Sequence, residues 1–163
     1  MLRRLQKMMS ALLLVCLLLP LCPAQAEETP ETDNWNDFTW SYTNAAGEAA
    51  ELQCSLYLPA AWQENHALPL ITYIPDSSLV NKALNTCKRA ACPANWLKGE
   101  KTRALPAAML ILRFTSPSPA VTAEGGESAQ IVPVVDQVTA QYGLDPDRLY
   151  LTGQSMGGIM DFA

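Results

Sequence analysis

Two nearly uninterrupted apolar runs are the feature that most limits how this 163-residue chain can fold. The first run covers 70–74 and ends at Pro75, and the second covers 107–114 and ends at the proline-containing TSPSPA. Strands that are apolar at nearly every position have both faces buried, as in a parallel sheet covered by helices. The runs therefore predict an α/β fold in which strands alternate with helices.

The segment before the first run predicts an antiparallel opening to this sheet. Phe38, Trp40 and Tyr42 alternate with polar residues, and the even-numbered positions of 52–58 continue the alternation after a turn at Gly47. A period of two on both sides of a turn is typical of a β-hairpin. Between the two apolar runs, 75–106 is predicted to be irregular with helical pieces.

The last part of the chain continues the alternation of helix and strand. Within 126–143, apolar residues recur at helical spacing: Ile131, Val134, Val135 and Val138. Gly143 is a natural C-terminal stop for this helix, and Pro133 is compatible with it only in the first turn. The sequence DPDR at 145–148 predicts a turn, and 149–152 predicts another buried strand.

The first 26 residues have the pattern of a secretory signal peptide. A basic start precedes an apolar run at 11–21, and the small-residue site Ala24-Gln25-Ala26 follows it. We expect cleavage after Ala26 and export to the periplasm or the medium. A retained anchor is a less favoured alternative, because the run is shorter than the about 20 residues of a membrane span. A lipid on Cys22 is less favoured still, because Cys22 follows Leu-Pro-Leu rather than small residues. After it, 27–37 is predicted to be a flexible acidic N-terminus, and 38–163 to be the folded domain.

Charge and residue usage exclude several kinds of partner. Three of the 11 basic residues lie in the signal, whereas none of the 16 acidic ones does, so the mature chain is strongly acidic. This argues against nucleic acid or an anionic membrane as a partner. With no C-x-x-C and only one histidine, His66, the sequence predicts no metal site and no cofactor. Its oligomeric state is left open.

Three cysteines remain after the predicted signal, namely Cys54, Cys87 and Cys92. An exported protein can form disulfides, and an odd number of cysteines leaves one thiol free or paired elsewhere. Cys87 and Cys92 are close enough in sequence to clip a loop, but Cys54 could pair with either. The sequence leaves the pairing open.

Gly153-Gln154-Ser155-Met156-Gly157 matches the pattern G-x-S-x-G directly after the last predicted strand. In this pattern the serine occupies a sharp turn between a strand and a helix, which exposes its hydroxyl above the sheet edge. The flanking glycines let neighbouring backbone pack closely. The amide of Met156, at the start of the helix, could stabilise a developing oxyanion. A turn in which the glycines serve packing alone is the alternative.

The segment GLDPDRLYLTGQSMGG (143–158) resembles the nucleophile segment of exported α/β-hydrolase esterases, of the polyhydroxybutyrate-depolymerase and feruloyl-esterase type, and of their prolyl-oligopeptidase-like relatives. GEAAELQCSLYLPAAW and LPLITYIPDSS are similar to that family's opening hairpin and third strand. The resemblance implies an α/β-hydrolase fold with Ser155 as nucleophile and the Met156 amide as an oxyanion donor. By position the Ser77 amide would be the second donor, although Pro75-Asp76 replaces the family's His-Gly pair.

The histidine and the acid that would activate this serine are not found where the resemblance expects them, since both follow the nucleophile along the chain. Asp161 belongs to the helix behind the serine and is not expected to be the acid. His66 is expected in a surface loop away from the site, and Asp76 is expected to shape a turn. The sequence thus predicts a fold truncated after the serine turn, with about five of about eight strands. The last strand would be an exposed apolar edge.

Two functional hypotheses follow. The first is a serine hydrolase, most simply an esterase with a small-molecule or polymeric ester as substrate and a peptidase as a variant, represented by an inactive N-terminal part. The second is a non-enzymatic exported binding domain built on the same fold, in which tryptophans could contact a glycan or protein. The four tryptophans, Trp35, Trp40, Trp62 and Trp96, form no stripe, so we expect them to pack internally.

Overall fold

The computed structural model describes residues 34–100, 106–115 and 126–160. Its strands are β1 (Trp35–Thr43), β2 (Ala49–Tyr57), β3 (Leu70–Ile74), β4 (Ala108–Arg113) and β5 (Leu149–Gly153). Its α-helices are α2 (Leu84–Lys88), α3 (Ala91–Glu100), α4 (Ile131–Tyr142) and α5 (Met156–Met160). Short 3-10 helices are η2 (Ala60–Gln63), η3 (Ser77–Leu79) and η5 (Ser128–Gln130). The predicted signal peptide, the acidic segment up to residue 33 and Asp161 lie outside the described residues.

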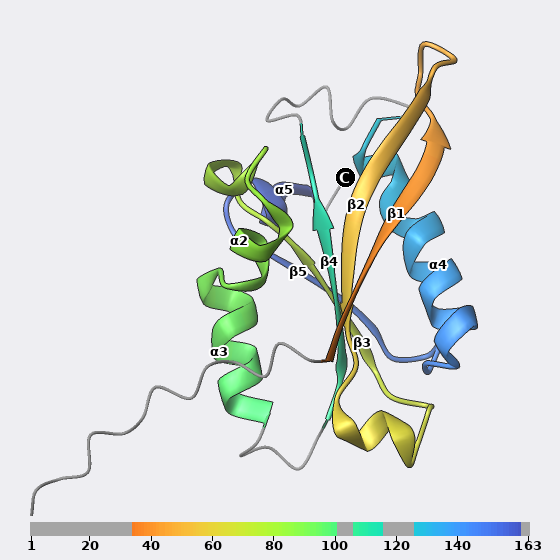
Figure 1. The fold of residues 1–163 in the computed structure, drawn as a ribbon, viewed down its shortest axis with the longest axis vertical. Coiled ribbons are helices and arrows are strands. Elements are labelled where there is room, and N and C mark those ends of the chain that lie inside the picture. The colour runs from red at the N-terminus through yellow and green to blue at the C-terminus, as the bar shows by residue number, and fades with distance from the viewer. Residues whose placement is uncertain (1–33, 101–105, 116–125, 161–163) are drawn as a thin grey trace, which may run out of the picture.

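The strands form one mixed sheet in the order β1-β2-β4-β3-β5. The hairpin of β1 and β2 is antiparallel, β2 pairs antiparallel with β4, and β3 pairs parallel with both β4 and β5. Figure 1 shows α4 on one face of this sheet and α2 and α3 on the other. The α/β prediction is therefore confirmed, with parallel strands following the antiparallel opening.

Each face of the sheet has its own apolar core. The face under α4 buries alternate residues of β2, β3 and β4 together with Ile131, Val134 and Val138 of the helix. The opposite face buries the intervening strand residues against α2 and α3, including Tyr73, Met109 and Ile111. This double burial is the reason that β3 and β4 are apolar at nearly every position.

The structure corrects the predicted start of the folded domain. β1 begins at Trp35, so the last residues of the predicted flexible segment 27–37 are part of the sheet. Trp35 pairs with Tyr57, and Asp37 accepts a hydrogen bond from the Ser55 hydroxyl at 2.5 Å and forms an ion pair with Lys88 at 2.6 Å. These partners are distant in sequence, so the acidic composition of the segment does not show them.

Other predicted boundaries hold. Pro133 lies in the first turn of α4, where its missing N–H breaks no intrahelical bond. Gly143 ends the helix with a φ of 64°, in the left-handed region that a side chain would disfavour. The irregular stretch after β3 contains the predicted helical pieces as α2 and α3.

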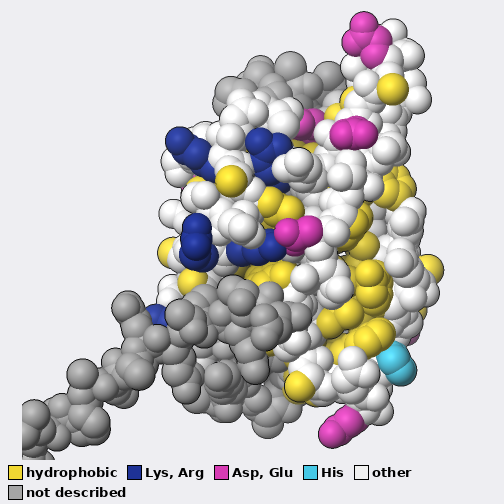
Figure 2. All heavy atoms as spheres, viewed as in Figure 1, with side chains coloured by type: hydrophobic (Ala, Val, Ile, Leu, Met, Phe, Trp, Pro, Cys, Tyr) yellow, Lys and Arg dark blue, Asp and Glu magenta, His cyan; other side chains and the backbone are white. Residues whose placement is uncertain are grey.

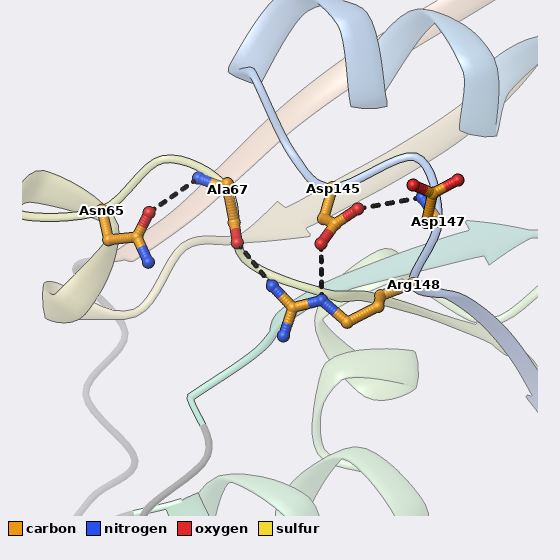
Figure 3. A network of polar contacts seen from close by, with 5 residues as sticks. All are labelled: Asn65, Ala67, Asp145, Asp147 and Arg148. Atoms are coloured by element: carbon orange, nitrogen blue, oxygen red, sulfur yellow. Dashed lines mark hydrogen bonds and ion pairs between the residues drawn. The ribbon is translucent and has the colours of Figure 1, made fainter.

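A polar network fixes where β5 begins beside β3 (Figure 3). The Asp145 carboxylate accepts from the Asp147 amide and from Nε of Arg148, at 2.9 and 2.6 Å. Nη2 of Arg148 also donates to the carbonyl of Ala67, at 2.8 Å, in the loop before β3. The DPDR turn is thus confirmed, and it ties the loop before β5 to the loop before β3. In this way it sets the register that brings Ile74 opposite Gly153.

Within the described residues, β5 is an edge strand with apolar side chains exposed to solvent. Leu149, Tyr150 and Leu151 are 37%, 56% and 39% exposed, whereas the neighbouring β3 is buried throughout. An exposed, apolar edge is open to pairing with another chain. The predicted open edge is therefore present, but the prediction that 149–152 is a buried strand is wrong, because within the described residues only β3 pairs with β5 and its side chains stay exposed. Among the described residues, no helix has the length and apolar character needed to cross a membrane.

Candidate functional site: a strained serine turn

The turn between β5 and α5 forces one serine into an unusual conformation. β5 ends at Gly153 and α5 begins at Met156, which leaves Gln154 and Ser155 to reverse the chain. Ser155 has a φ of 54°, in the left-handed region, and its side chain is exposed. An L-residue in that region costs roughly 1–2 kcal/mol relative to the right-handed one. The surrounding packing must hold the strain, which is a common feature of functional sites.

Two glycines make this turn possible. A Cβ on Gly157 would lie 2.1 Å from the carbonyl oxygen of Ile74, at the end of β3. A Cβ on Gly153 would lie 2.3 Å from the carbonyl carbon of Gly157. Both distances are far inside van der Waals contact and involve backbone atoms, so no side-chain rotation could relieve them. The glycines of the G-x-S-x-G pattern therefore let α5 pack directly against the end of β3.

This packing brings the serine turn beside the loop that follows β3. Ile74 pairs with Gly153, so Ser77 and Ser155 lie a few residues past the ends of adjacent parallel strands. Asp76 caps the 3-10 helix η3, because its carboxylate accepts from the Ser78 amide at 2.7 Å. The turn-shaping role predicted for Asp76 is confirmed. The Ser77 amide lies in the first turn of η3, at the same edge of the sheet as Ser155.

Contacts that sequence reasoning missed hold this loop. Asn81 has a φ of 60°, and its backbone N–H donates a hydrogen bond to the Phe114 carbonyl at 3.2 Å. Nε of Arg113 donates to the carbonyl of Lys82. Both contacts join the loop to the end of β4. Nothing in the local sequence pairs Arg113 with Lys82, and a single asparagine between Val80 and Lys82 is too weak a signal for a left-handed turn.

The one histidine lies at the opposite end of the sheet from the serine turn. His66 is exposed, in the loop before β3, and its ring meets the Trp62 ring edge-on with 4.5 Å between centroids. Figure 2 shows the histidine, in cyan, at the lower end of the molecule, whereas α5 lies near the upper end in Figure 1. The predicted surface position of His66 is confirmed. Across the described ranges, no group of three or more His, Cys, Asp or Glu side chains is arranged to hold a metal ion.

An apolar groove of about 600 Å³ lies elsewhere, between α3 and the early parts of β3 and β5. Its lining includes Leu68, Ile71, Trp96, Met109, Tyr150 and Thr152. Neither Ser155 nor Ser77 lines it. The groove is therefore a different place on the molecule from the serine turn.

The four tryptophans pack within the fold, as the sequence predicted. Nε1 of Trp40 donates to the Gln130 side chain at 3.1 Å, and Nε1 of Trp62 donates to the carbonyl of Tyr142 at 3.0 Å. Trp35 and Trp96 pack against the core under α2 and α3. All four side chains are partly buried.

Comparison with known proteins identifies the fold. No protein-family model and no curated protein matches the sequence. A carboxyl esterase 2 from the fungus Tuber melanosporum is similar in structure with a TM-score of 0.53 and 18% identity, over 82% of this chain and 40% of that one. An α/β-hydrolase from the metagenome of Lake Arreo has a TM-score of 0.51 and 20% identity, over 77% and 36%.

An enterobactin and salmochelin hydrolase has a TM-score of 0.50 and 15% identity, over 79% of this chain and 56% of that one. The chain thus spans between 36% and 56% of the length of these three solved structures. Each aligns with 77% to 82% of the present chain. The chain therefore has an α/β-hydrolase fold, of which the described residues supply five strands.

Proposed function

We propose that the complete enzyme is a serine hydrolase in which Ser155 is the nucleophile. The observation that carries this proposal is the strained, exposed conformation of Ser155, held by two glycines against the end of β3. A left-handed serine at a strand-to-helix turn presents its hydroxyl outward, where a substrate carbonyl can approach it. Packing alone would not require a serine at this strained position, since glycine adopts that conformation without steric cost.

The backbone around Ser155 could stabilise the oxyanion of an acyl-transfer reaction. The Gly157 amide is already bonded to the Gln154 carbonyl at 3.0 Å, so it belongs to the turn itself. The amide before it, that of Met156, is the oxyanion donor that we propose. The Ser77 amide is the proposed second donor, because its loop reaches the same edge of the sheet. Two such amides aimed at one oxygen would stabilise its negative charge in the transition state.

The proton of the Ser155 hydroxyl requires a base. His66 lies at the other end of the sheet, and Asp76 is committed to capping η3. We propose that the histidine and its acid come from polypeptide beyond these 163 residues, in the complete enzyme, and that the present chain is idle on its own. In the complete enzyme the histidine would accept the hydroxyl proton during attack on the carbonyl and donate it to the leaving group.

An ester is the substrate class that we propose. The structural neighbours named above include a carboxyl esterase, which supports the assignment at the level of the class. A peptidase with the same acyl-enzyme chemistry is the variant to be separated from it by substrate assays. We further propose that the chain is exported after cleavage behind Ala26. N-terminal sequencing of the secreted or periplasmic protein would test that cleavage.

The experiment extends the chain in its own gene. The native locus is expressed through the codons that follow residue 163, beside the 163-residue chain, and both are treated with a fluorophosphonate. We expect an adduct on Ser155 in the extended protein, its loss in Ser155→Ala, and little labelling of the short chain. A folded extended protein that carries a histidine in the added part but gives no adduct on Ser155 would contradict the hydrolase proposal. A locus with no such continuation would favour the exported binding domain instead.

A further inference from the structure

The three cysteines of the described residues lie on opposite faces of the sheet. Cys54, in β2, is fully buried in the core under α4, where it is paired in register with Phe38 and Leu112. Cys87 and Cys92 belong to the other core, under α2 and α3. The sheet backbone therefore separates the Cys54 sulfur from both of the other sulfurs. All three cysteines are free thiols in the structure.

Cys87 and Cys92 flank a tight turn between two helices. Cys87 is the fourth residue of α2 and Cys92 is the second of α3, and only Arg89 and Ala90 separate the helices. The Ala90 amide donates to the Cys87 carbonyl at 3.1 Å, which keeps the turn compact. Burial, followed by the charges of Cys92, Asp76 and Cys87, raises the pKa of Tyr73 to about 12. Cys87 and Cys92 also pack in the same apolar core as Tyr73, on one face of the sheet.

We propose that Cys87 and Cys92 form a redox-active pair that closes to an intramolecular disulfide, and that Cys54 takes no part. Cys92 is partly exposed whereas Cys87 is fully buried, so Cys92 is the thiol that meets an external oxidant first. The oxidant that we name is a small disulfide such as oxidised glutathione.

The exchange proceeds in two steps. The Cys92 thiolate attacks one sulfur of oxidised glutathione, forms a mixed disulfide and releases one glutathione thiolate. The Cys87 thiolate then attacks the Cys92 sulfur and releases the second glutathione. Two electrons pass from the protein to the oxidant, and the two protons lost by the cysteines are taken up by the glutathione thiolates. Because burial raises the pKa of both thiols, the exchange should be faster at alkaline pH.

The Cys87–Cys92 disulfide would link α2 to the start of α3, near the loop that carries Ser77 and the apolar groove. α2 follows the loop that carries Ser77, and Cys92 lines the apolar groove beside Trp96. A Cys87–Cys92 disulfide would fix the start of α3, and hence this wall of the groove, relative to α2. The proposal does not depend on whether Ser155 is a nucleophile.

The test maps the disulfide in the full chain carrying Cys16→Ser and Cys22→Ser. The reduced protein is equilibrated with glutathione buffers, blocked with an alkylating agent and digested with trypsin. Cleavage at Lys82, Lys88, Arg89 and Lys98 places the two cysteines in separate peptides, 83–88 and 90–98. We expect these two peptides to be joined by a disulfide, with a mass about 2 Da below the sum of the reduced peptides. We expect Cys54 to be alkylated only after denaturation.

Two variants sharpen the result. Cys54→Ser should leave the amount of the linked peptides unchanged, and Cys92→Ser should abolish it. Three outcomes would overturn the proposal. They are a disulfide that contains Cys54, a disulfide between two chains through Cys92, and full alkylation of both Cys87 and Cys92 in the folded protein after equilibration with excess oxidised glutathione.

Discussion

Replacing Gly157 by alanine should disrupt the serine turn more than its small size suggests. The new Cβ would lie 2.1 Å from the carbonyl oxygen of Ile74 and 2.9 Å from its carbonyl carbon. These are backbone atoms of a fully buried strand, so either α5 or the end of β3 must move by about 1 Å. Overpacking of this kind costs typically about 1–3 kcal/mol, and the absence of a side chain that can rotate away places Gly157→Ala at the upper end.

Gly158→Ala is the matched control in the same helix. Its Cβ would meet no atom closer than 3.5 Å, the carbonyl oxygen of Gly153, which is an ordinary contact. Alanine is favoured over glycine within a helix by up to about 1 kcal/mol, so Gly158→Ala should be neutral or stabilising. The difference between the two variants should therefore be about 3 kcal/mol.

Urea unfolding followed by tryptophan fluorescence measures this difference. The midpoint should fall for Gly157→Ala and stay or rise for Gly158→Ala, with similar dependence of the free energy on denaturant. Free energies of unfolding that agree within about 0.5 kcal/mol for the two variants would refute the claim that α5 packs against the end of β3 through Gly157.

Three further predictions concern strain, the sheet edge and charge. Ser155→Gly should stabilise the fold by about 0.5–1 kcal/mol in the same urea assay because glycine tolerates the left-handed turn, whereas Ser155→Ala should give no gain. The exposed apolar edge of β5 should promote self-association, and Leu151→Lys on this edge should reduce it in sedimentation velocity. Unchanged association in the variant would rule out this edge as the cause. Burial opposes ionisation of Asp37, but hydrogen bonds from Lys88 and Ser55 outweigh it and lower its pKa below 3.8. The ion pair should thus contribute under about 1 kcal/mol to the free energy of unfolding above pH 4, and Lys88→Gln should lower the free energy of unfolding there. The difference between the variant and the parent chain in the urea assay should vanish as the pH falls below the lowered pKa of Asp37.

The sequence predicted the elements whose patterns are local. The runs at 70–74 and 107–114 had to be strands covered on both faces, and the structure buries them between α4 on one side and α2 and α3 on the other. Gly143 and the DPDR turn also behaved as predicted, because a left-handed helix end and an aspartate-led turn depend on residues next to one another.

What the sequence could not predict depends on residues that are distant along the chain. The three residues from Trp35 to Asp37 look like a polar tail, but they enter the sheet through contacts with Tyr57, Ser55 and Lys88. The separation of Cys54 from the other cysteines required the face of each strand relative to the helices. The link between Arg113 and Lys82 likewise follows only from the packing of the loop after β3 against the end of β4.

The motif at Ser155 combines features that local sequence predicts with a feature that depends on distant residues. Its glycine spacing predicted a sharp turn, and the positive φ of the serine and the tight approach of Gly157 to Ile74 are present. The position of the neighbouring loop with Ser77 could be expected only from the resemblance to a family, because it depends on β3 and β5 being adjacent.

The proposal that Ser155 is a nucleophile waiting for a base is tested most directly by supplying that base. The 163-residue chain is treated with a fluorophosphonate at pH 7, with and without a high concentration of imidazole, and the adduct is located by peptide mapping with Ser155→Ala as control. We predict little adduct without imidazole and an imidazole-dependent adduct on Ser155, absent in the variant. Strong labelling of Ser155 without imidazole, or an imidazole-dependent adduct spread over other serines with none on Ser155, would contradict it.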